Sequence, residues 1–387
     1  MDSIFRPTRV EISLDALTHN VAQFRRHLPP DMKLMGVVKA NAYGHGAVPI
    51  ARELQSLGVD ALCVAILDEG LELRKHGVHV PIIVMGYTPA EGLRLAAEHD
   101  IALSMYDPAL LNEAENITLP RPLRVHVKID SGMGRIGLHE KEQAIRFIDQ
   151  ALSNPALEVE GLFTHYASAD DRDKTATHGQ HARFNEIVSH YARQDIHFPW
   201  IHAGNSATAI DTPELSFNAV RIGVSLYGMY PSQEVDRTNV HLLPVMTYKS
   251  GVSMVKVLPK GSGISYGSTY VTQTDEQIVT IPVGYGDGYS RMLSHQAHVL
   301  LHGQKIPVVG NICMDQCMAN ASGLSHIQMG DEVVLFGSQQ DASIPVEEIA
   351  DHLGTINYEV TCMVSNRVPR VYIRQGQIDQ IVNPLLH

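Results

Sequence analysis

The feature that most constrains this chain is the alternation of short apolar runs with amphipathic helical stretches over about its first 225 residues. Each run is rich in Val, Ile and Leu, which is typical of a strand buried on both faces of a parallel sheet. Strand–helix alternation of this kind predicts repeated βα units. Eight strand candidates follow one another, at residues 34–39, 61–65, 81–85, 101–104, 124–129, 159–164, 198–202 and 220–224.

Eight βα units predict an α/β fold whose first domain, residues 10–240, closes into a (β/α)8 TIM-like barrel. A doubly wound open sheet is the structural alternative. No G-x-G-x-x-G follows the first strand, which argues against a dinucleotide-binding sheet. From residue 241 to 387 the runs become shorter, with Gly and Pro between them and one clear helix candidate at residues 345–353. This pattern predicts a β-rich C-terminal domain, which the strand within residues 1–12 is expected to join.

The composition excludes several classes of protein. The chain has 30 Lys and Arg against 42 Asp and Glu, a net charge of −12, and no basic run, so nucleic acid and anionic membranes are not expected partners. No apolar stretch reaches the roughly 18 residues that span a bilayer. The first residues lack the apolar core of a signal peptide, and four cysteines are too few for a disulfide scaffold. A cytoplasmic location is expected.

Chemically useful side chains stand where the predicted barrel strands end, which is where barrel enzymes place their active sites. Two lysines and an arginine at one rim would repel one another unless an anion lies between them, and a phosphate-bearing cofactor would supply it. A lysine at the end of an apolar strand also suits Schiff-base chemistry, because burial and cationic neighbours favour the neutral amine. The side chains are Lys39, Lys128, Thr164, His165, Asn205, Ser206 and Arg221.

Residues 38–46, Val-Lys-Ala-Asn-Ala-Tyr-Gly-His-Gly, resemble the pyridoxal-phosphate lysine motif of alanine racemases. The resemblance recurs in order from about residue 10 to residue 372. Gly204, Gly286 and Asn311 depart from the usual pattern without removing a reacting group. The matching segments are residues 128–137, 164–170, 202–207, 218–223, 264–270, 283–288, 312–316 and 358–360.

The resemblance implies an amino-acid racemase that interconverts L- and D-alanine through a pyridoxal-phosphate aldimine. It implies that Lys39 holds the cofactor and moves the Cα proton on one face, and that Tyr266 of the partner subunit does so on the other. The protein is therefore expected to be a homodimer with active sites shared across the interface. D-alanine for peptidoglycan, or alanine catabolism, is the implied physiological role.

The resemblance also implies roles for the surrounding residues. Arg221 would donate to the pyridine nitrogen and keep it unprotonated, with His165 beside it. Arg135 would approach the substrate carboxylate, oriented by Lys128 if that lysine is carbamylated. The cofactor's phosphate would be held by Tyr43, Ser206, Tyr358 and the main-chain amides of Gly223 and Val224. Asn205, in the segment that matches the phosphate-loop pattern, is also implied to bind the cofactor. Tyr285, Cys313, Met314 and Asp315 would shape the entrance and the carboxylate site from the partner subunit, Met314 through its main-chain N–H.

Three other functions compete with this interpretation. A metal-dependent hydrolase on the same barrel needs converging ligands. The one candidate cluster in the sequence comprises His178, His181, Asp170, Asp171 and Asp173. No metal is expected. A non-enzymatic pyridoxal-phosphate carrier would resemble the barrel alone. A decarboxylase of the same class would want an acidic group at the pyridine nitrogen, where Arg221 is implied. Three alternatives stay open at the level of the sequence: whether alanine or serine is the preferred substrate, whether the role is biosynthetic or catabolic, and whether Lys128 is carbamylated.

Overall fold

The computed structural model describes residues 4–386, which divide into two compact units. The barrel unit comprises Leu17–Ala42 and Gly46–Leu243. The β unit comprises the described residues up to Ala16, the short segment Tyr43–His45, and the described residues from Pro244 onward. The chain therefore leaves the barrel unit for three residues directly after the strand-end segment that carries Lys39.

The barrel unit holds eight parallel strands in the order β8-β7-β6-β5-β4-β3-β2-β9. The ring closes between β8 and β9, where Asn218 N donates to Ile201 O at 3.2 Å and Arg221 N to Gly204 O at 3.1 Å. The predicted (β/α)8 barrel is confirmed, and the open doubly wound sheet is wrong. The strands are β2 (Lys33–Val37), β3 (Ala61–Val64), β4 (Ile82–Val84), β5 (Ile101–Met105), β6 (Leu123–Lys128), β7 (Leu157–Phe163), β8 (Trp200–His202) and β9 (Ala219–Ile222).

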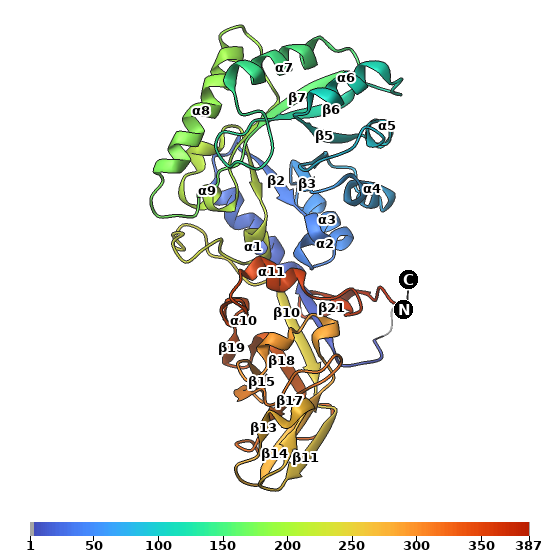
Figure 1. The fold of residues 1–387 in the computed structure, drawn as a ribbon, viewed down its shortest axis with the longest axis vertical. Helices are drawn as coiled ribbons and strands as arrows, with labels where there is room; N and C mark the ends of the chain where they lie inside the picture. Colours follow the sequence, from blue (N-terminus) through green and yellow to red (C-terminus); the bar gives the residue numbers. More distant parts are fainter. Residues whose placement is uncertain (1–3, 387) are drawn as a thin grey trace. The chain divides into compact units, whose positions relative to one another are not determined.

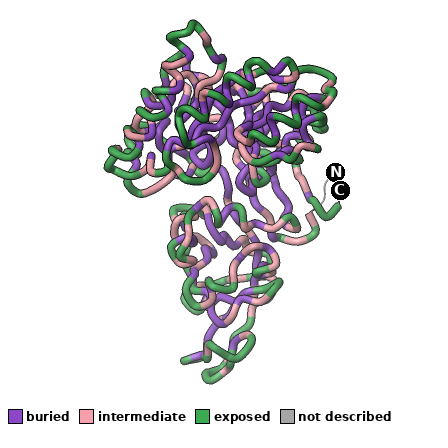
Figure 2. Tube along the Cα trace, turned by 45° about the horizontal axis from the view of Figure 1, so that its top comes forward, coloured by how far each residue is buried: buried purple, intermediate pink, exposed green. Residues whose placement is uncertain are grey.

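Helices alternate with these strands and lie on the outer side of the ring (Figure 1). Figure 2 shows that the buried residues follow the strands, while exposed residues gather on helices and loops. Helix α8 begins six residues earlier than the predicted helical run at 181–193, because Thr177 and Gln180 occupy its buried face where apolar residues were expected. The helices are α1 (Leu14–His27), α3 (Ala47–Ser56), α4 (Leu67–Lys75), α5 (Gly92–Glu98), α6 (Pro108–Asn116), α7 (Lys141–Ser153), α8 (Thr175–Ala192) and α9 (Ser206–Asp211).

The β unit is built on a mixed sheet in the order β16-β15-β18-β10-β1-β20-β21, with β19 paired to β18. Strand β1 (Arg9–Ser13) lies antiparallel to β10 and parallel to β20, so the N-terminal strand belongs to this sheet. Two smaller sheets, β11-β14-β17 and β12-β13, complete the unit. The other strands are β10 (Met246–Gly251), β11 (Met254–Leu258), β12 (Gly263–Ile264), β13 (Tyr270–Val271), β14 (Glu276–Ile281), β15 (His298–Leu301), β16 (Gln304–Pro307), β17 (Cys317–Asn320), β18 (Glu332–Gln339), β19 (Ala342–Ile344), β20 (Arg370–Arg374) and β21 (Gln377–Val382).

Two helices accompany these strands. Helix α10 (Val346–Leu353) matches the predicted helix at residues 345–353. Helix α11 (Asn357–Cys362) was not predicted, because six residues are too few to establish a helical period in the sequence.

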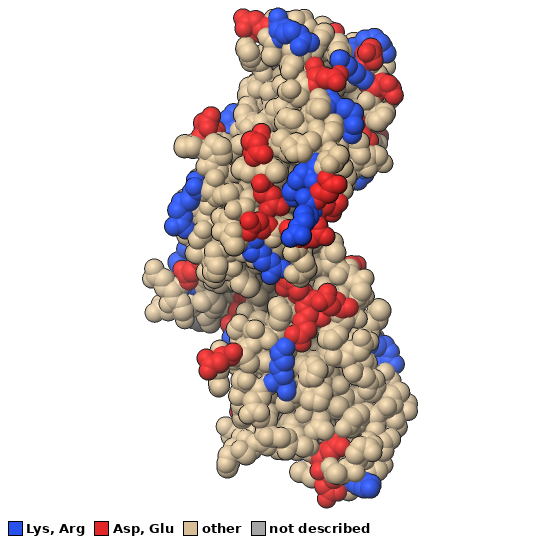
Figure 3. All heavy atoms as spheres, turned by 90° about the vertical axis from the view of Figure 1, so that its left-hand side faces the viewer, with Lys and Arg blue, Asp and Glu red and all other residues tan. Residues whose placement is uncertain are grey.

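The surface carries charges of both signs. On the face drawn in Figure 3, Asp and Glu side chains lie interspersed with Lys and Arg side chains. Exposed ion pairs such as Arg121–Asp100 and Lys141–Glu186 contribute little to stability individually. Within residues 4–386, none of the helices combines the length and the apolar character needed to cross a bilayer.

Candidate active site

The carboxyl ends of the barrel strands bring four cationic groups around one imidazole. Lys128 is the last residue of β6, Arg221 lies in β9, and Lys39 stands two residues after the end of β2. His165, just beyond β7, is half-buried, and its pKa lies well below the usual value. Burial is the largest cause, followed by the charges of Arg221, Lys128, Arg135 and Lys39. His165 is therefore neutral at physiological pH, in a strongly positive environment.

The segment after Lys39 is a single left-handed turn. Residues Ala40, Asn41, Ala42 and Tyr43 have φ between 50° and 54°, which L-residues rarely adopt. The turn is labelled α2 (Lys39–Tyr43). At about 1 kcal/mol or more per residue, it persists only if neighbouring groups hold it.

Polar contacts on both sides hold this turn in place. The carboxylate of Glu69 accepts from Ala40 N at 2.6 Å, and the side chain of Asn41 accepts from Ala47 N at 2.8 Å. Two further main-chain bonds close it, from Ala42 N to Val38 O at 2.9 Å and from Gly46 N to Asn41 O at 2.9 Å. The position of Lys39 is thus defined by the barrel strand before it and by a braced turn after it.

Arg221 is a buried cation surrounded by neutral acceptors. Its Nη2 atom donates to Thr164 O at 2.9 Å, to Ala203 O at 2.9 Å and to His165 Nδ1 at 3.0 Å. Its Nη1 atom donates to His202 Nδ1 at 2.6 Å. Burial lowers the pKa of Arg221 to about 10, so it stays charged at neutral pH. None of the carboxylates in the described chain lies within ion-pair distance of it.

Lys128 and Asp130 lie two residues apart on the same rim. Their surroundings favour the charged form of Asp130 but the neutral form of Lys128. Burial raises the pKa of Asp130, but main-chain N–H bonds from Gly132, Met133 and Gly134 outweigh it, so the net pKa is lowered. Lys128 donates to Ile129 O at 2.9 Å. Burial first, and then the charge of Arg221, lower the pKa of Lys128 to about 7. A part of Lys128 is therefore a neutral, nucleophilic amine at physiological pH, which carbamylation requires.

The lowered pKa of Lys128 predicts a pH-dependent stability. Unfolded lysine titrates near pH 10.4, so between pH 7 and that value the unfolded chain binds a proton that the folded chain does not. The free energy of unfolding then rises with pH across this window, by about 3 kcal/mol between pH 7 and pH 10. Urea unfolding of cofactor-free protein in bicarbonate-free buffer measures it, with Lys128→Met as the reference. Parallel pH profiles for the two proteins would contradict the assignment.

The predicted phosphate residues of the barrel unit lie just after β8 and just after β9. Ser206 is buried, and its Oγ accepts from Gly223 N at 3.0 Å. Val224, the next residue, is also buried. The side chain of Asn205 caps α9 by accepting from Thr208 N at 3.1 Å. The structure therefore brings Ser206, Gly223 and Val224 together, while Asn205 orders the helix that begins with Ser206.

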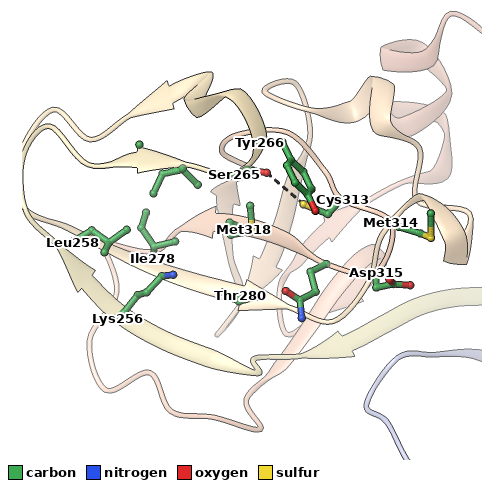
Figure 4. Close-up of a pocket in the computed structure, with 13 residues that line it drawn as sticks. Lys256, Leu258, Ser265, Tyr266, Ile278, Thr280, Cys313, Met314, Asp315 and Met318 are labelled. Carbon is green, nitrogen blue, oxygen red and sulfur yellow. Dashed lines mark hydrogen bonds between the residues drawn. The ribbon is translucent and has the colours of Figure 1, made fainter.

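In the β unit, Tyr266 stands beside a pocket whose floor is the small three-stranded sheet (Figure 4). The Tyr266 side chain is 72% exposed. Its main chain is fixed by neighbours, because Ser265 Oγ donates to Asn311 O at 2.6 Å and Asn311 Nδ2 donates to Tyr266 O at 2.8 Å. Cys313 Sγ lies 3.4 Å from Ser265 Oγ. Figure 4 shows Met314 and Asp315 at the end of the same pocket that lies opposite Lys256 and Leu258.

A buried carboxylate ties the loops of Tyr285 and Asp315 together. Asp287 has no exposed side-chain surface and accepts from Arg6 at 2.6 Å and from Arg367 Nε at 2.8 Å. Arg367 Nη2 also bonds Asp315 at 2.7 Å. Main-chain bonds join the loops directly, from Tyr285 N to Cys313 O at 3.1 Å and from Gly286 N to Met314 O at 2.9 Å. A Cβ at residue 286 would meet the Arg367 guanidinium at 2.7 Å, so Gly286 makes room for this arrangement.

The two tyrosines predicted to hold phosphate are neighbours in the β unit. The rings of Tyr43 and Tyr358 lie 6.3 Å apart between centroids, tilted by 49°. The segment after Tyr43 is anchored by β20, where Arg370 donates to Gly44 O at 3.1 Å and Tyr372 OH to His45 O at 2.9 Å. These anchors fix the main chain that carries Tyr43.

The acidic and histidine side chains considered as metal ligands do not converge. His181 Nδ1 lies 3.0 Å from Tyr166 OH, and Asp173 accepts from Thr175 at the start of α8. Among residues 4–386, three or more His, Cys, Asp or Glu side chains placed to hold one metal ion are not found.

Several supporting residues escaped the sequence interpretation. Glu69 has the position of a helix-capping acid in α4, but it also braces the turn after Lys39. Asn311 was noted only as a departure from the family pattern, and Arg367 was not noted. Their roles depend on contacts between distant segments, for which the sequence carries no local signal.

Comparisons with known proteins cover almost the whole chain. The family model described as the N-terminal domain of alanine racemase matches residues 12–231, and the model of the C-terminal domain matches residues 245–372. The alanine racemase of Halalkalibacterium halodurans is 44% identical over 390 residues, covering 100% of both chains. That of Desulforamulus reducens is 43% identical over 369 residues, covering 95% of this chain and 99% of the relative.

Solved structures agree over the same length. An alanine racemase from Bacillus anthracis with bound L-Ala-P superposes with a TM-score of 0.94 at 38% identity, covering 100% of both chains. An alanine racemase from Clostridium difficile in complex with cycloserine gives a TM-score of 0.92 at 38% identity, covering 99% of this chain and 100% of the other.

Proposed function

This chain belongs to the alanine racemase family, and we propose that it interconverts L- and D-alanine with pyridoxal 5′-phosphate held at the strand ends of its barrel unit. The family depends on that cofactor. Similarity over the C-terminal domain, residues 245–372, argues against a carrier whose likeness would end with the barrel. D-alanine for peptidoglycan, or alanine catabolism, is the role we propose.

The residues at the barrel rim fit such a cofactor. The observation that carries the proposal is the cluster of Lys39, Lys128, Arg135 and Arg221 around His165, with Arg221 buried and lacking a carboxylate partner within the described chain. The nearby carboxylate of Asp130 is already occupied by three main-chain N–H groups. A polar cradle with this excess of positive charge suits an anionic, phosphate-bearing ligand.

We assign the cofactor contacts residue by residue. Lys39 would bind it covalently, and Arg221 would donate to its ring nitrogen, because a guanidinium only donates. Tyr43, Ser206, Tyr358, Gly223 and Val224 would hold the phosphate, with Asn205 ordering α9. When bound, pyridoxal phosphate supplies an electron sink that acidifies the Cα–H of the amino acid.

Two side chains then move the Cα proton. The amine of Lys39 takes or returns it on one face, and the phenol of Tyr266 does so on the opposite face, because racemisation needs an acid–base group on each side. Arg135 and the main-chain N–H of Met314 orient the substrate carboxylate, and the negative charge of a carbamate on Lys128 would orient Arg135. Tyr285, Cys313 and Asp315 shape the entrance.

The surroundings of Tyr266 support a site shared between two subunits. A phenol that exchanges protons with a carbon acid works best where water is excluded. Yet Tyr266 is 72% exposed in the single chain, and Met314 in the same pocket is 53% exposed. Apolar side chains on the neighbouring sheet, Met254 and Val257, are also exposed. A second copy of the chain would cover this face and bring Tyr266 to its barrel rim, so we propose a homodimer.

Optical activity tests the proposed reaction directly. Enantiopure L-alanine, incubated with the cofactor-loaded protein, is expected to lose its circular dichroism completely while the total alanine concentration stays constant. D-alanine should reach the same endpoint. A stable signal would contradict alanine racemisation, and consumption of alanine would indicate decarboxylation or transamination instead.

A further inference from the structure

A row of buried polar side chains leads from Arg221 away from the strand ends. Arg221 Nη1 lies 2.6 Å from His202 Nδ1. His202 Nε2 lies 2.8 Å from His126 Nδ1, and His126 Nε2 lies 3.0 Å from a carboxylate oxygen of Glu160. Both histidines are fully buried, and the Glu160 side chain is 10% exposed. The chemistry proposed for the rim uses only the first member of this row.

The chemistry of these groups allows one direction of hydrogen bonding. A guanidinium only donates, so His202 Nδ1 accepts and its proton is on Nε2. His202 Nε2–H then donates to His126 Nδ1, and His126 Nε2–H donates to Glu160. Burial is the largest cause that lowers the pKa of both histidines, in keeping with two neutral rings. The row therefore has a cation at one end, a carboxylate at the other, and every donor matched to an acceptor.

The backbone is shaped to accommodate this row. The pairing of β6 with β7 shifts register at Val125/His126, which leaves Glu160 as the extra residue of a β-bulge. Bulges of this kind redirect a side chain, here toward His126. The next residue, Gly161, has no Cβ, and a Cβ there would collide with the His126 ring. The ring of His202 stacks on Phe163 at 4.8 Å with 9° between the planes.

We propose that Glu160 is the remote counter-charge of Arg221, acting through His126 and His202 as a positioning residue that fixes the orientation of the guanidinium. A buried cation without a countercharge is costly. Hydrogen bonds in a chain polarise one another, so a carboxylate at one end stabilises a cation at the other end more than it would through apolar packing alone. A second cation also lies near this carboxylate, since Arg124 Nη1 is 3.7 Å from Glu160.

The inference extends to the cofactor, and that part rests on the proposed function. The hydrogen bond from Arg221 Nη1 to His202 Nδ1 fixes the orientation in which the guanidinium would donate to a ring nitrogen. In Glu160→Gln, the side-chain amide can donate to His126 Nε2. The ring proton of His126 and that of His202 would then each lie on Nδ1 instead of Nε2. His202 Nδ1 would then carry a proton that faces Arg221, and the guanidinium would have to move.

Nuclear magnetic resonance of the histidine rings tests the relay without any turnover. In the native protein labelled with ¹⁵N-histidine, His126 and His202 should both appear as neutral rings protonated at Nε2, with downfield N–H protons protected from exchange. In Glu160→Gln these two signals are expected to shift or broaden. The matched control is Glu158→Gln, an exposed position on the same strand, which should leave them unchanged. Imidazolium rings or Nδ1–H tautomers in the native protein overturn the relay even if no variant folds.

A kinetic comparison tests the link to Arg221. Glu160→Gln is expected to lower kcat for alanine about tenfold with KM changed less than twofold, because Arg221 touches the cofactor rather than the amino acid. It should also weaken retention of pyridoxal phosphate during dialysis, whereas Glu160→Asp should recover part of both losses. Unchanged kcat and retention, with altered histidine signals, would refute the counter-charge role. Absence of racemisation by the native protein, with the expected histidine signals, would refute the proposed function but not the relay.

Discussion

Replacing Lys39 by alanine is expected to abolish racemisation and to remove the visible absorbance of lysine-bound pyridoxal phosphate. The amine is proposed both to bind the cofactor and to move one of the two protons, so activity should fall by a factor of about 10⁴ or more. Alanine at this position keeps the strand-end backbone, because the braced turn begins at the following residue. Spectra of the purified variant and polarimetry with L-alanine measure the two losses.

A surface lysine provides the control. Lys75 is an exposed residue at the end of α4, and Lys75→Ala should keep both the absorbance and the activity. Borohydride reduction of the native holoenzyme, followed by peptide mapping, should find the label on Lys39. A label on Lys128 would refute the assignment, since Lys128 is a second lysine at the rim and its pKa is lowered to about 7.

The barrel was predictable because its determinants are local. Several strands, such as β3 and β4, are continuous apolar runs with both faces buried, and helices such as α3 and α7 carry a clear amphipathic period. The polar residues at the strand ends then follow from the topology, because parallel strands place their carboxyl ends on one rim. Lys39, Lys128, His165 and Arg221 could be grouped in this way. The identity of the substrate could not, and it came from the resemblance.

The turn after Lys39 was beyond local prediction. Gly44 and Gly46 indicate a tight loop, but Ala40, Ala42 and Tyr43 give no sign of positive φ, because such residues avoid it in isolation. Their conformation is imposed by Glu69 and by the other contacts that brace the turn. Strained segments of this kind are visible only once tertiary contacts are known.

The relay below Arg221 was missed for a different reason. His126 lies in the apolar strand Val-His-Val-Lys, where a lone histidine is more often a satisfied core residue than a functional one. Its partner Glu160 is brought to it by a one-residue bulge, and a bulge shifts the expected alternation of faces. Glu160 then faces inward, although a regular strand pattern gives no reason to expect it there.

Mixing two inactive variants is expected to restore activity if the sites are shared between subunits. In a dimer of Lys39→Ala with Tyr266→Phe, one site combines both substitutions, and the other combines the native Lys39 of one chain with the native Tyr266 of its partner. Random exchange at equal concentrations gives half mixed dimers, each with one native site. The mixture should therefore regain about a quarter of native activity. Polarimetry after subunit exchange, verified with differently tagged chains, measures this.

The control for this experiment removes the native site while keeping the mixing. Lys39→Ala mixed with the double variant Lys39→Ala, Tyr266→Phe contains no native lysine in any site and should stay inactive. If the first mixture also stays inactive after verified exchange, Lys39 and Tyr266 do not meet across an interface. Something other than the partner subunit's barrel rim would then have to cover the exposed Tyr266 side chain. Recovery to about a quarter, by contrast, explains why a phenol that must work away from water is 72% exposed in its own chain.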